Sequence, residues 1–275
     1  MGTFLSPGNK GNELREYAHW CNAVEGNTTF YATPAPATIK RWSELAPASF
    51  RFAFKAPRTI THERRLAAGS SALLAEYLRA IAPLHDRCGP IQLQLPPSFG
   101  PDSIGALTRF VGGLPDEFSW TVELRHRAFF DGGTAHRAVD EVLGSAGVGR
   151  VVLDTRPLYA TPAMSEAAVA ERAQKPRLPV LTDLVGATPI VRVIGGDDEA
   201  GVVAGLRSWV PVAAGWLAEG RQPYVFAHQP DNRRSPALAR SFHAMLASEV
   251  DDLAPLPEPH PVAPASEIIG QASLF

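Results

Sequence analysis

The sequence predicts an α/β fold, a TIM-like (β/α)8 barrel, followed by a disordered Pro-rich C-terminal tail. Eight short apolar runs of strand length mostly alternate with helix-like patterns, which favours a closed parallel sheet. After Val250, Pro stands at nearly every second or third position. A doubly wound open sheet is the alternative, but the Gly-rich strand-to-helix turn that usually begins one is absent. We expect a barrel over 1–249, a flexible linker over 250–269 and a terminal peptide over 270–275.

Period-two alternation gives the clearest strand, in which Phe50, Phe52 and Phe54 alternate with small or basic residues. Pro57 then prevents further ladder pairing. The other expected strands are apolar runs that end at Gly, Pro or a charge. In chain order the strands are Gly2–Leu5, Cys21–Glu25, Phe50–Phe54, Ile91–Leu95, Trp120–Leu124, Val151–Leu153, Ile190–Ile194 and Tyr224–Ala227.

Helices are predicted between these strands from apolar residues at helical spacing and from capping residues such as Ser70. The segment Thr155–Pro189 breaks the regular alternation. It carries one helix-like piece near Ser165–Ala173, and its length is typical of a lid or a disordered excursion. The predicted helices are Asn12–His19, Thr38–Leu45, Ser70–Leu84, Asp102–Val111, Ala135–Ala146, Val202–Leu217 and Pro236–Ala247.

Composition excludes several classes of protein. With 45% hydrophobic residues in 275, a buried core is expected, and a net charge of −2 gives no overall attraction to nucleic acid or membrane. Cys21 and Cys88 are too few for a disulfide framework or a metal quartet, which suits a reducing cytoplasm. The start, MGTFLSPGNKG, lacks the apolar region of a signal peptide, and no apolar run is long enough to span a membrane.

Polar and charged residues gather where the predicted strands end, and in a barrel this is where functional groups lie. Alone, each would be a loop charge paired with a neighbour. Together they predict a site at the barrel top, where the fourth strand supplies Gln92 or Gln94. We predict catalytic roles for Glu25, Lys55, Glu123 and Asp154, and substrate binding by Asn27, Arg58, His62, Gln94, Arg125, Arg192, His228, Asp231 and Asn232.

Glu25 and Glu123 lie inside apolar runs, so their carboxylates are expected to be partly buried and to need cations or donors. Lys55, Arg125 and Arg192 are the natural partners. One interpretation is a buried ion network that closes the barrel top. The other is a general acid or base held among cations that bind an anionic substrate.

A metal site is not assigned. The available ligands are mixed with cations and lack the tight spacing of a zinc helix motif, although a divalent metal cofactor stays an open alternative. These ligands are Glu25, Glu123, Asp154, His62, His126, His228 and Asp231.

Four segments, VEGNTTFYATP, WSELAPASFRFAFKAPRTITHERRL, GPIQLQLPPSF and VELRHRAFF, resemble the DUF72 (YecE-like) family in order and over roughly residues 12–247. The resemblance implies a TIM-barrel-like fold similar in shape to the endonuclease IV and xylose isomerase barrels. It leaves the reaction open. The family positions it carries over are Glu25, Asn27, Lys55, Arg58, His62, Gln94, Glu123, Arg125, Asp154 and Arg192.

Two departures from the family pattern concern the first strand and the seventh. A GTSGW-type first strand is replaced by MGTFLSPGNKG. The family's RxHG is here Arg192-Val193-Ile194-Gly195, so the histidine is missing, and His228 is the candidate to replace it in space. A mechanism that depends on the seventh-strand histidine would not transfer unchanged.

The C-terminal QASLF resembles the peptide by which bacterial proteins bind the DNA polymerase sliding clamp. Gln271 and Ser273 would form hydrogen bonds, and Leu274 and Phe275 would fill an apolar pocket. A Pro-rich tether would let the peptide reach the clamp while the barrel stays free. A chance apolar terminus, or a tail docked on its own barrel, is the alternative interpretation.

Three functional hypotheses follow. The first is a nucleic-acid-directed hydrolase, acting on phosphodiesters or in repair, that the sliding clamp recruits and in which Glu25 or Glu123 is the general base. The second is a non-catalytic DNA-associated adaptor. The third is an enzyme for a phosphorylated or carboxylate metabolite. A contiguous basic groove would favour nucleic acid, and a deep pocket under Thr155–Pro189 would favour a metabolite.

Overall fold

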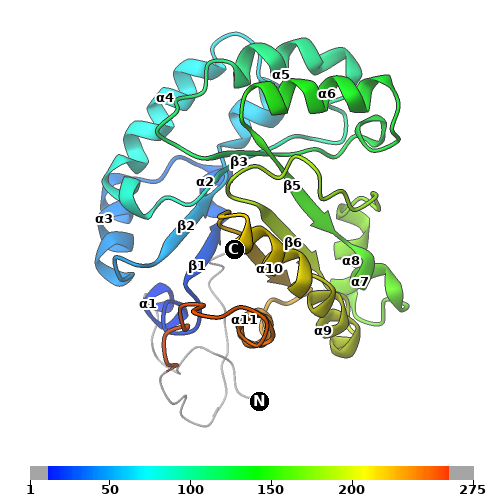
Figure 1. The fold of residues 1–275 in the computed structure, drawn as a ribbon. Helices are drawn as coiled ribbons and strands as arrows, with labels where there is room; N and C mark the ends of the chain where they lie inside the picture. Colours follow the sequence, from blue (N-terminus) through cyan, green and yellow to red (C-terminus); the bar gives the residue numbers. More distant parts are fainter. Residues whose placement is uncertain (1–11, 260–275) are drawn as a thin grey trace.

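A computed structural model describes residues 12–259. Within this range the chain forms seven strands, each close to its predicted position, with helices arranged around their outside (Figure 1). The expected strand Gly2–Leu5 lies outside the described residues. The strands are β1 Ala23–Gly26, β2 Arg51–Phe54, β3 Ile91–Gln94, β4 Trp120–Glu123, β5 Gly149–Asp154, β6 Ile190–Ile194 and β7 Tyr224–His228.

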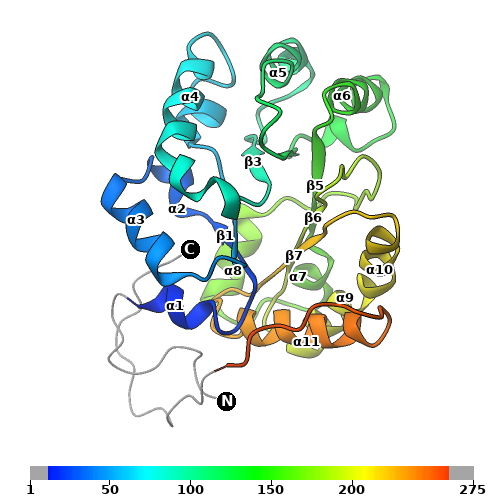
Figure 2. The same ribbon diagram turned by 60° about the vertical axis from the view of Figure 1, so that its left-hand side comes forward.

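All strand pairs are parallel and follow chain order, β1 with β2 and then β3 through β7. Isolated bridges from Phe52 to Cys88 and from Lys55 to Gln92 connect the two groups. β1 also lies beside β7, so the sheet curls back on itself (Figure 2). A doubly wound sheet reverses its strand order at a switch point, and no reversal occurs among residues 12–259. The fold is therefore an α/β fold with a curled parallel sheet.

The two faces of the curled sheet differ in chemistry because side chains alternate along each strand. Ile91, Leu93 and Val122 point outward and pack with the surrounding helices in the larger apolar cluster. On the inner face, a small apolar layer that includes Val151 and Tyr224 fills the end where the strands begin. The inner face nearer the strands' carboxyl ends is polar instead.

Most predicted helices are present, with ends shifted by a few residues. Four short pieces among residues 12–259 were not predicted, namely α2, the π-helix η1, the turn η4 and α7. The helices and turns are: α1 Glu13–Tyr17, α2 Thr28–Tyr31, α3 Pro36–Leu45, η1 Thr59–Glu63, α4 Ser70–Ile81, η2 Ala82–Arg87, η3 Pro101–Ser103, α5 Ile104–Val111, η4 Arg127–Phe129, α6 Thr134–Ser145, α7 Arg156–Ala160, α8 Glu166–Gln174, α9 Glu199–Ser208, α10 Val210–Ala218 and α11 Ser235–Ala247.

The single helix predicted at Val202–Leu217 is two helices, α9 and α10, which meet at Trp209. Pro211 lies in the first turn of α10, where its missing N–H costs no helical hydrogen bond. Glu199–Ala218 is also the one stretch within residues 12–259 that is long and apolar enough to cross a membrane. Val202, Leu206 and Trp209 are buried in the apolar cluster beneath it, so we assign the pair to the helical layer.

Two irregular segments have defined positions. The Thr155–Pro189 segment contains α7 and α8 and is held near the strand ends. The described part of the expected linker, 250–259, follows α11: Leu253 packs in the apolar cluster and Arg240 donates to the Pro257 carbonyl at 2.8 Å. The rest of the linker and the terminal peptide, including Gln271, lie outside the described residues.

Candidate functional site

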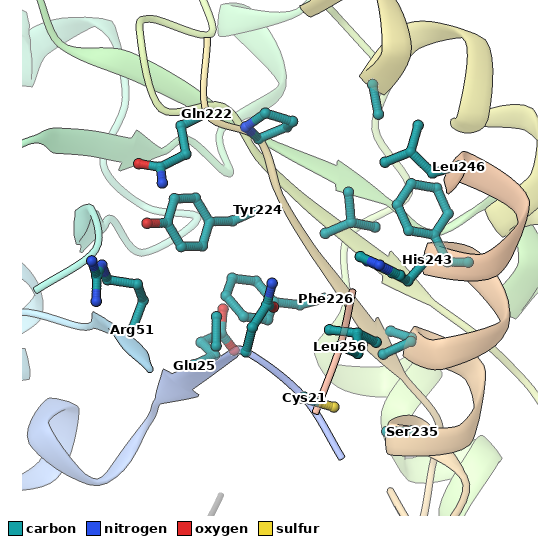
Figure 3. A pocket seen from close by; sticks show the side chains of 18 of the residues that line it. Cys21, Glu25, Arg51, Gln222, Tyr224, Phe226, Ser235, His243, Leu246 and Leu256 are labelled. Carbon is teal, nitrogen blue, oxygen red and sulfur yellow. The ribbon is translucent and has the colours of Figure 1, made fainter. Parts of the chain in front are cut away.

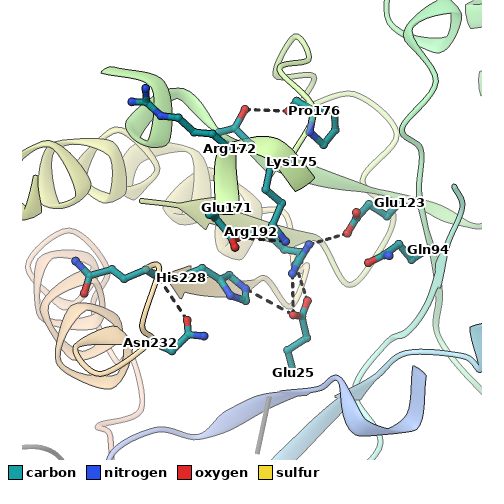
Figure 4. Close-up of polar contacts among 12 residues, drawn as sticks. Glu25, Gln94, Glu123, Glu171, Arg172, Lys175, Pro176, Arg192, His228 and Asn232 are labelled. Carbon is teal, nitrogen blue, oxygen red and sulfur yellow. Dashed lines mark hydrogen bonds and ion pairs between the residues drawn. The ribbon is translucent and has the colours of Figure 1, made fainter. Parts of the chain in front are cut away.

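The polar inner layer is built by side chains from six different strands or strand ends. Strand alternation places them on one face. Gln94 pairs with Glu123, Lys55 bridges to Gln92, and Glu25 is level with Ala53, two residues before Lys55. Arg192 is level with Phe226, two residues before His228. The predicted residues that the structure brings together here are Glu25, Lys55, Gln94, Glu123, Arg125, Arg192 and His228, with Gln92 beside them (Figure 4).

Arg192 is the centre of this layer and is 2% exposed. Its Nε lies 2.6 Å from Glu25 Oε1, and its Nη2 donates to Glu25 Oε2 at 3.0 Å. Its Nη1 donates to Glu123 Oε2 at 2.9 Å. One guanidinium therefore bridges two buried carboxylates that come from β1 and β4.

The remaining carboxylate contacts come from the neighbouring residues. Arg125 Nε and Nη2 both lie 2.6 Å from Glu123 Oε1. Gln92 Nε2 donates to Glu25 Oε1 at 3.1 Å, and Lys55 Nζ lies 3.5 Å from Glu25 Oε2. All four carboxylate oxygens of the two glutamates thus contact a cation.

The pKa values of both glutamates follow from this pairing. Burial raises the pKa of Glu25, but the charges of Arg192 and Lys55 outweigh burial and hold it well below its usual value. The pKa of Glu123 is also lowered, because Arg125 and Arg192 outweigh the effect of burial. Both carboxylates are ionised at neutral pH, and a carboxylate with so low a pKa is a weak proton acceptor.

Lys55, unlike the two glutamates, has a pKa close to physiological pH. Its Nζ donates to Gln94 Oε1 at 3.1 Å, and its side chain is 5% exposed. Burial, and then repulsion by Arg192, lowers the pKa of Lys55 to about 8, although the attraction of Glu25 opposes this. A group whose pKa lies near physiological pH can gain and lose a proton during a reaction.

His228 lies where the sequence hypothesis required a substitute histidine. It is the direct cross-strand neighbour of Ile194, which stands at the missing family position. Its Nε2 is 3.6 Å from Glu25 Oε2. Burial and the charge of Arg192 lower the pKa of His228 to about 3, so the imidazole is neutral near pH 7 and this contact is not an ion pair.

The rim of the site includes Arg58 and His62 from the segment that follows β2. Arg58 is exposed and lies 3.8 Å from Glu63. His62 is half-buried, packs edge-on against Phe30, and lies 3.0 Å from Thr61 Oγ1 through its Nδ1. Burial, and then the charges of Arg125 and Arg58, lower the pKa of His62 to about 4. His62 is therefore a neutral group beside a positive region.

Lys175 is a site residue that the sequence did not predict. It follows α8 in the Thr155–Pro189 segment and points toward Arg192 and Glu123, with Glu171 Oε1 at 3.4 Å (Figure 4). Burial and the charge of Arg192 lower its pKa. No local pattern marks this lysine, since it reaches the layer only through the path of a long irregular segment.

Asp154 was predicted as catalytic, and the structure does not bring it to this layer. Asp154 pairs with Val193 of β6, and the Val193 side chain packs against the helices. The Asp154 side chain therefore faces the helices too, whereas Arg192, one residue before Val193, faces inward. The Asp154 carboxylate accepts from Trp209 Nε1 at 2.8 Å and pairs with Arg156. Because neighbouring residues of a strand face opposite sides of the sheet, Asp154 connects β5 to the helical layer and does not enter the polar layer.

Three of the predicted binding residues lie apart from the polar layer. Asp231 is exposed, and its Oδ1 accepts from the backbone N–H of Arg233 at 3.1 Å. Asn232 has a φ of 53° and supports the turn after β7 through Ser235. Asn27 begins α2 and accepts the Phe30 N–H through its carbonyl. Within residues 12–259, no group of three or more His, Cys, Asp or Glu is placed to hold a metal ion.

Comparison with known proteins places these residues in a family. The profile of the family described as "Protein of unknown function DUF72" matches residues 1–263. The chain is 38% identical over 244 residues to the UPF0759 protein YecE of Escherichia coli K12, covering 89% of each chain. The same protein of E. coli O157:H7 matches equally, at 38% identity over 89% of each chain.

Two solved structures share the fold. A DUF72 family protein from Enterococcus faecalis V583 gives a TM-score of 0.65 at 17% identity, covering 88% of this chain and 90% of that one. A DUF72 family protein from Thermotoga maritima MSB8 gives 0.58 at 21% identity, covering 82% and 84%. The sequence profile and the sequence relatives agree with the fold, and the chain belongs to the DUF72 family.

Proposed function

We propose that the polar layer binds the anionic group of a phosphate-bearing substrate and that Lys55 transfers a proton there. The observation that carries this proposal is an excess of positive charge that persists after pairing. Four cations, Lys55, Arg125, Lys175 and Arg192, face three carboxylates, Glu25, Glu123 and Glu171.

Mutual repulsion among these cations supports an anion as the missing partner. The pKa values of Lys55, Lys175 and His62 are all lowered, first by burial and then by neighbouring cations. An oxyanion placed among them would relieve this repulsion. Arg125, at 12% side-chain exposure, and the exposed Arg58 both reach solvent, as does Lys175 at 16%. They would hold the phosphate while Arg192 keeps the two glutamates fixed.

The proton-transfer role belongs to Lys55 rather than to the glutamates. Glu25 and Glu123 keep the function of fixing the cations, since each is held ionised by its partners. Lys55, with a pKa of about 8, is present in both protonation states at physiological pH. This assignment replaces our first expectation that a glutamate is the general base.

The substrate that we favour is nucleic acid, with hydrolysis of a phosphodiester or a repair intermediate as the reaction and a cytoplasmic location. The terminal QASLF supports this choice, since it would bring the chain to the sliding clamp on DNA. A small phosphorylated metabolite is the second candidate. It is favoured by the position of Lys175, which the Thr155–Pro189 segment carries over the layer and which suits an enclosed ligand.

Anion binding is tested by titrating the full-length protein with inorganic phosphate and with a short single-stranded oligonucleotide. Arg125→Met should weaken both by about tenfold or more, since charge-assisted hydrogen bonds contribute about 1.5–3 kcal/mol. Arg127→Met is the matched control, because Arg127 is exposed two residues further along. Equal binding by wild type and Arg125→Met would refute the proposed site.

Recruitment is tested by calorimetric titration of the sliding clamp with the full-length chain and with a chain that lacks Gln271–Phe275. Micromolar binding that is lost on truncation would support a role in replication or repair. Absence of binding in both forms would remove the clamp from the proposal and leave the phosphorylated metabolite as the substrate.

We further propose that the curled sheet is part of a (β/α)8 barrel closed by the predicted strand Gly2–Leu5. Within residues 12–259, β1 pairs only with β2 and β7 only with β6, so one edge of each strand faces the other. A cavity of about 310 Å³ separates them. Tyr224 and Phe226 line one side of it, opposite Glu25 and Arg51 (Figure 3). An apolar strand between two parallel edges would satisfy the backbone groups of both.

A further inference from the structure

Lys55 stands out among the cations of the polar layer because its amine is held in place but weakly paired. Its contact with Glu25 Oε2 is 3.5 Å long, and that oxygen already accepts from Arg192 at 3.0 Å. Its one short contact is the 3.1 Å hydrogen bond to Gln94 Oε1. The amine is thus fixed in direction without being fully neutralised.

A further observation concerns Gln92, which lies directly across the strand bridge from Lys55. Gln92 is completely buried, and its Oε1 has no hydrogen-bond partner among residues 12–259. A buried acceptor without a donor is costly unless a bound group supplies one. The layer therefore places a hydrogen-bond acceptor beside an amine at the same level of the sheet.

We propose that Lys55 forms an imine with the aldehyde or ketone of a phosphate-bearing substrate. The inference rests on the proposed anion site, which would hold the phosphate near Arg125 while the carbonyl carbon meets Lys55 Nζ. Desolvation and adjacent cations are the conditions that activate a lysine as a nucleophile. Both are present, since burial and Arg192 lower the pKa of Lys55 to about 8.

The step balances without an additional reagent. The neutral amine attacks the carbonyl carbon and forms a C–N bond, and the carbonyl oxygen becomes the hydroxyl of a carbinolamine. That hydroxyl can donate to Gln92 Oε1. It then takes back the proton that the lysine ammonium released to solvent before the attack and leaves as water, so ammonium plus carbonyl gives protonated imine plus water. The nitrogen carries one positive charge before and after, and Glu25 can therefore serve as counterion throughout.

The same chemistry can come from two sources, a free sugar phosphate or the aldehydic sugar of an abasic site in DNA, where phosphates flank the carbonyl. The test therefore has two arms. The full-length protein is incubated with glyceraldehyde 3-phosphate or with an oligonucleotide containing one abasic site, each with and without sodium borohydride. Borohydride reduces an imine to a stable amine, which intact mass and peptide mapping detect.

Mapping is unambiguous because the chain has four lysines, Lys10, Lys40, Lys55 and Lys175. We expect a borohydride-dependent adduct on Lys55 at least tenfold above that on exposed Lys40, and loss of it in Lys55→Arg but not in Lys40→Arg. Because the wild-type map identifies the residue by itself, the result does not depend on folding of a variant. The arm that gives the adduct identifies the source.

Three outcomes would overturn the inference: an adduct on Lys175 in place of Lys55, equal labelling of Lys55 and Lys40 in both arms, or no borohydride-dependent adduct in either arm. Glycerol 3-phosphate, which lacks the carbonyl, separates this failure from failure of the anion site. If it binds and no adduct forms, the imine is refuted while the anion site stands. If neither it nor inorganic phosphate binds, the proposed function fails as well. Equal labelling by uncharged glyceraldehyde would likewise refute the need for a phosphate.

Discussion

Arg192 is the residue on which the two buried glutamates depend. It contacts Glu25 through Nε and Nη2 and Glu123 through Nη1, all within 3.0 Å. Removal of one partner from a buried ion network leaves an unpaired charge, which costs far more than the network gains. The arginine is therefore essential for stability whatever the site binds.

We expect Arg192→Met to lower the free energy of unfolding by about 3–5 kcal/mol, measured by urea denaturation. The double variant Arg192→Met/Glu25→Gln is the matched control. It removes the carboxylate that has lost both of its short Arg192 contacts, while Glu123 keeps Arg125 at 2.6 Å, so it should recover part of the loss. A loss below about 1 kcal/mol in the single variant would show that the glutamates find other partners.

The lowered pKa of His228 predicts that the free energy of unfolding depends on pH. This pKa is lowered from 6.5 to about 3 in the folded state, so between these values the unfolded chain takes up a proton that the folded chain does not. Stability must therefore fall as pH falls through this window, by at most about 1.4 kcal/mol per pH unit for one proton.

The check is urea denaturation at several pH values between about 6.5 and 5, above the range in which the glutamates contribute. His228→Asn should give a shallower decline than wild type. His62→Asn and His243→Asn remove the other two histidines of residues 12–259 whose pKa is lowered, and they separate the three contributions. An unchanged slope in His228→Asn would contradict the assignment.

The sequence correctly predicted which residues gather at the strand ends where a strand determines the direction of the side chain. Glu25, Lys55, Glu123 and Arg192 were placed together because strand ends meet at one edge of a parallel sheet. Asp154 was misplaced, since the sequence does not reveal which of two alternating faces a residue occupies. Lys175 was missed because its position depends on tertiary contacts of a long segment.

At the scale of elements, α8 is held at both ends. The Asp197 carboxylate accepts from the Met164 and Ser165 backbone N–H groups at 2.7 and 2.9 Å, and from Ser165 Oγ. At the other end, Tyr159 Oη donates to the Lys175 carbonyl at 2.8 Å. These contacts fix the helix whose following residue, Lys175, enters the polar layer.

We expect Asp197→Ala to release the start of α8 and to weaken phosphate binding by about fivefold, the factor that corresponds to about 1 kcal/mol. Hydrogen exchange should increase over residues 164–168, and titration with phosphate measures the affinity. Asp116→Ala is the control, since Asp116 is exposed in the turn before β4 at the opposite end of the strands. Increased hydrogen exchange with unchanged phosphate affinity would show that the position of α8 does not affect the site.

The prediction of elements was most accurate for the strands. Period-two alternation and the flanking Pro and Gly residues defined β2 and β3 within one residue. The break between α9 and α10 could not be predicted, because Pro211 is compatible both with a kink and with a new first turn. The unpredicted pieces, such as α2, are short and arise from tertiary packing.

At the scale of the whole molecule, closure of the sheet gives a further prediction. If Gly2–Leu5 completes the barrel between β1 and β7, a charge at Phe4 would have to enter a cavity walled in part by Tyr224 and Phe226 or be excluded from it. We expect Phe4→Asp to lower the free energy of unfolding by about 3 kcal/mol or more, as for loss of a large core side chain. Lys10→Asp, outside the predicted strand, is the control. Equal stability of the two variants would refute closure by this segment.

The sequence predicted a closed barrel of eight parallel strands, because apolar runs in regular alternation with helices have few other arrangements, and residues 12–259 show seven of these strands in a curled parallel sheet. It could not predict that the inner face divides into an apolar and a polar layer. That division depends on the register between strands, which no single strand determines.

The span of the Arg192 network along the chain has a consequence for biosynthesis. Glu25 and Arg192 are 167 residues apart. At about 5–20 residues per second, a ribosome adds Arg192 about 8–33 s after Glu25. Until then Glu25 can pair only with Lys55 and Glu123 only with Arg125, so the cation that bridges β1 and β4 is missing. The polar layer is consequently complete only after β6 and β7 have been synthesised, and a nascent chain interrupted before β6 lacks its central cation.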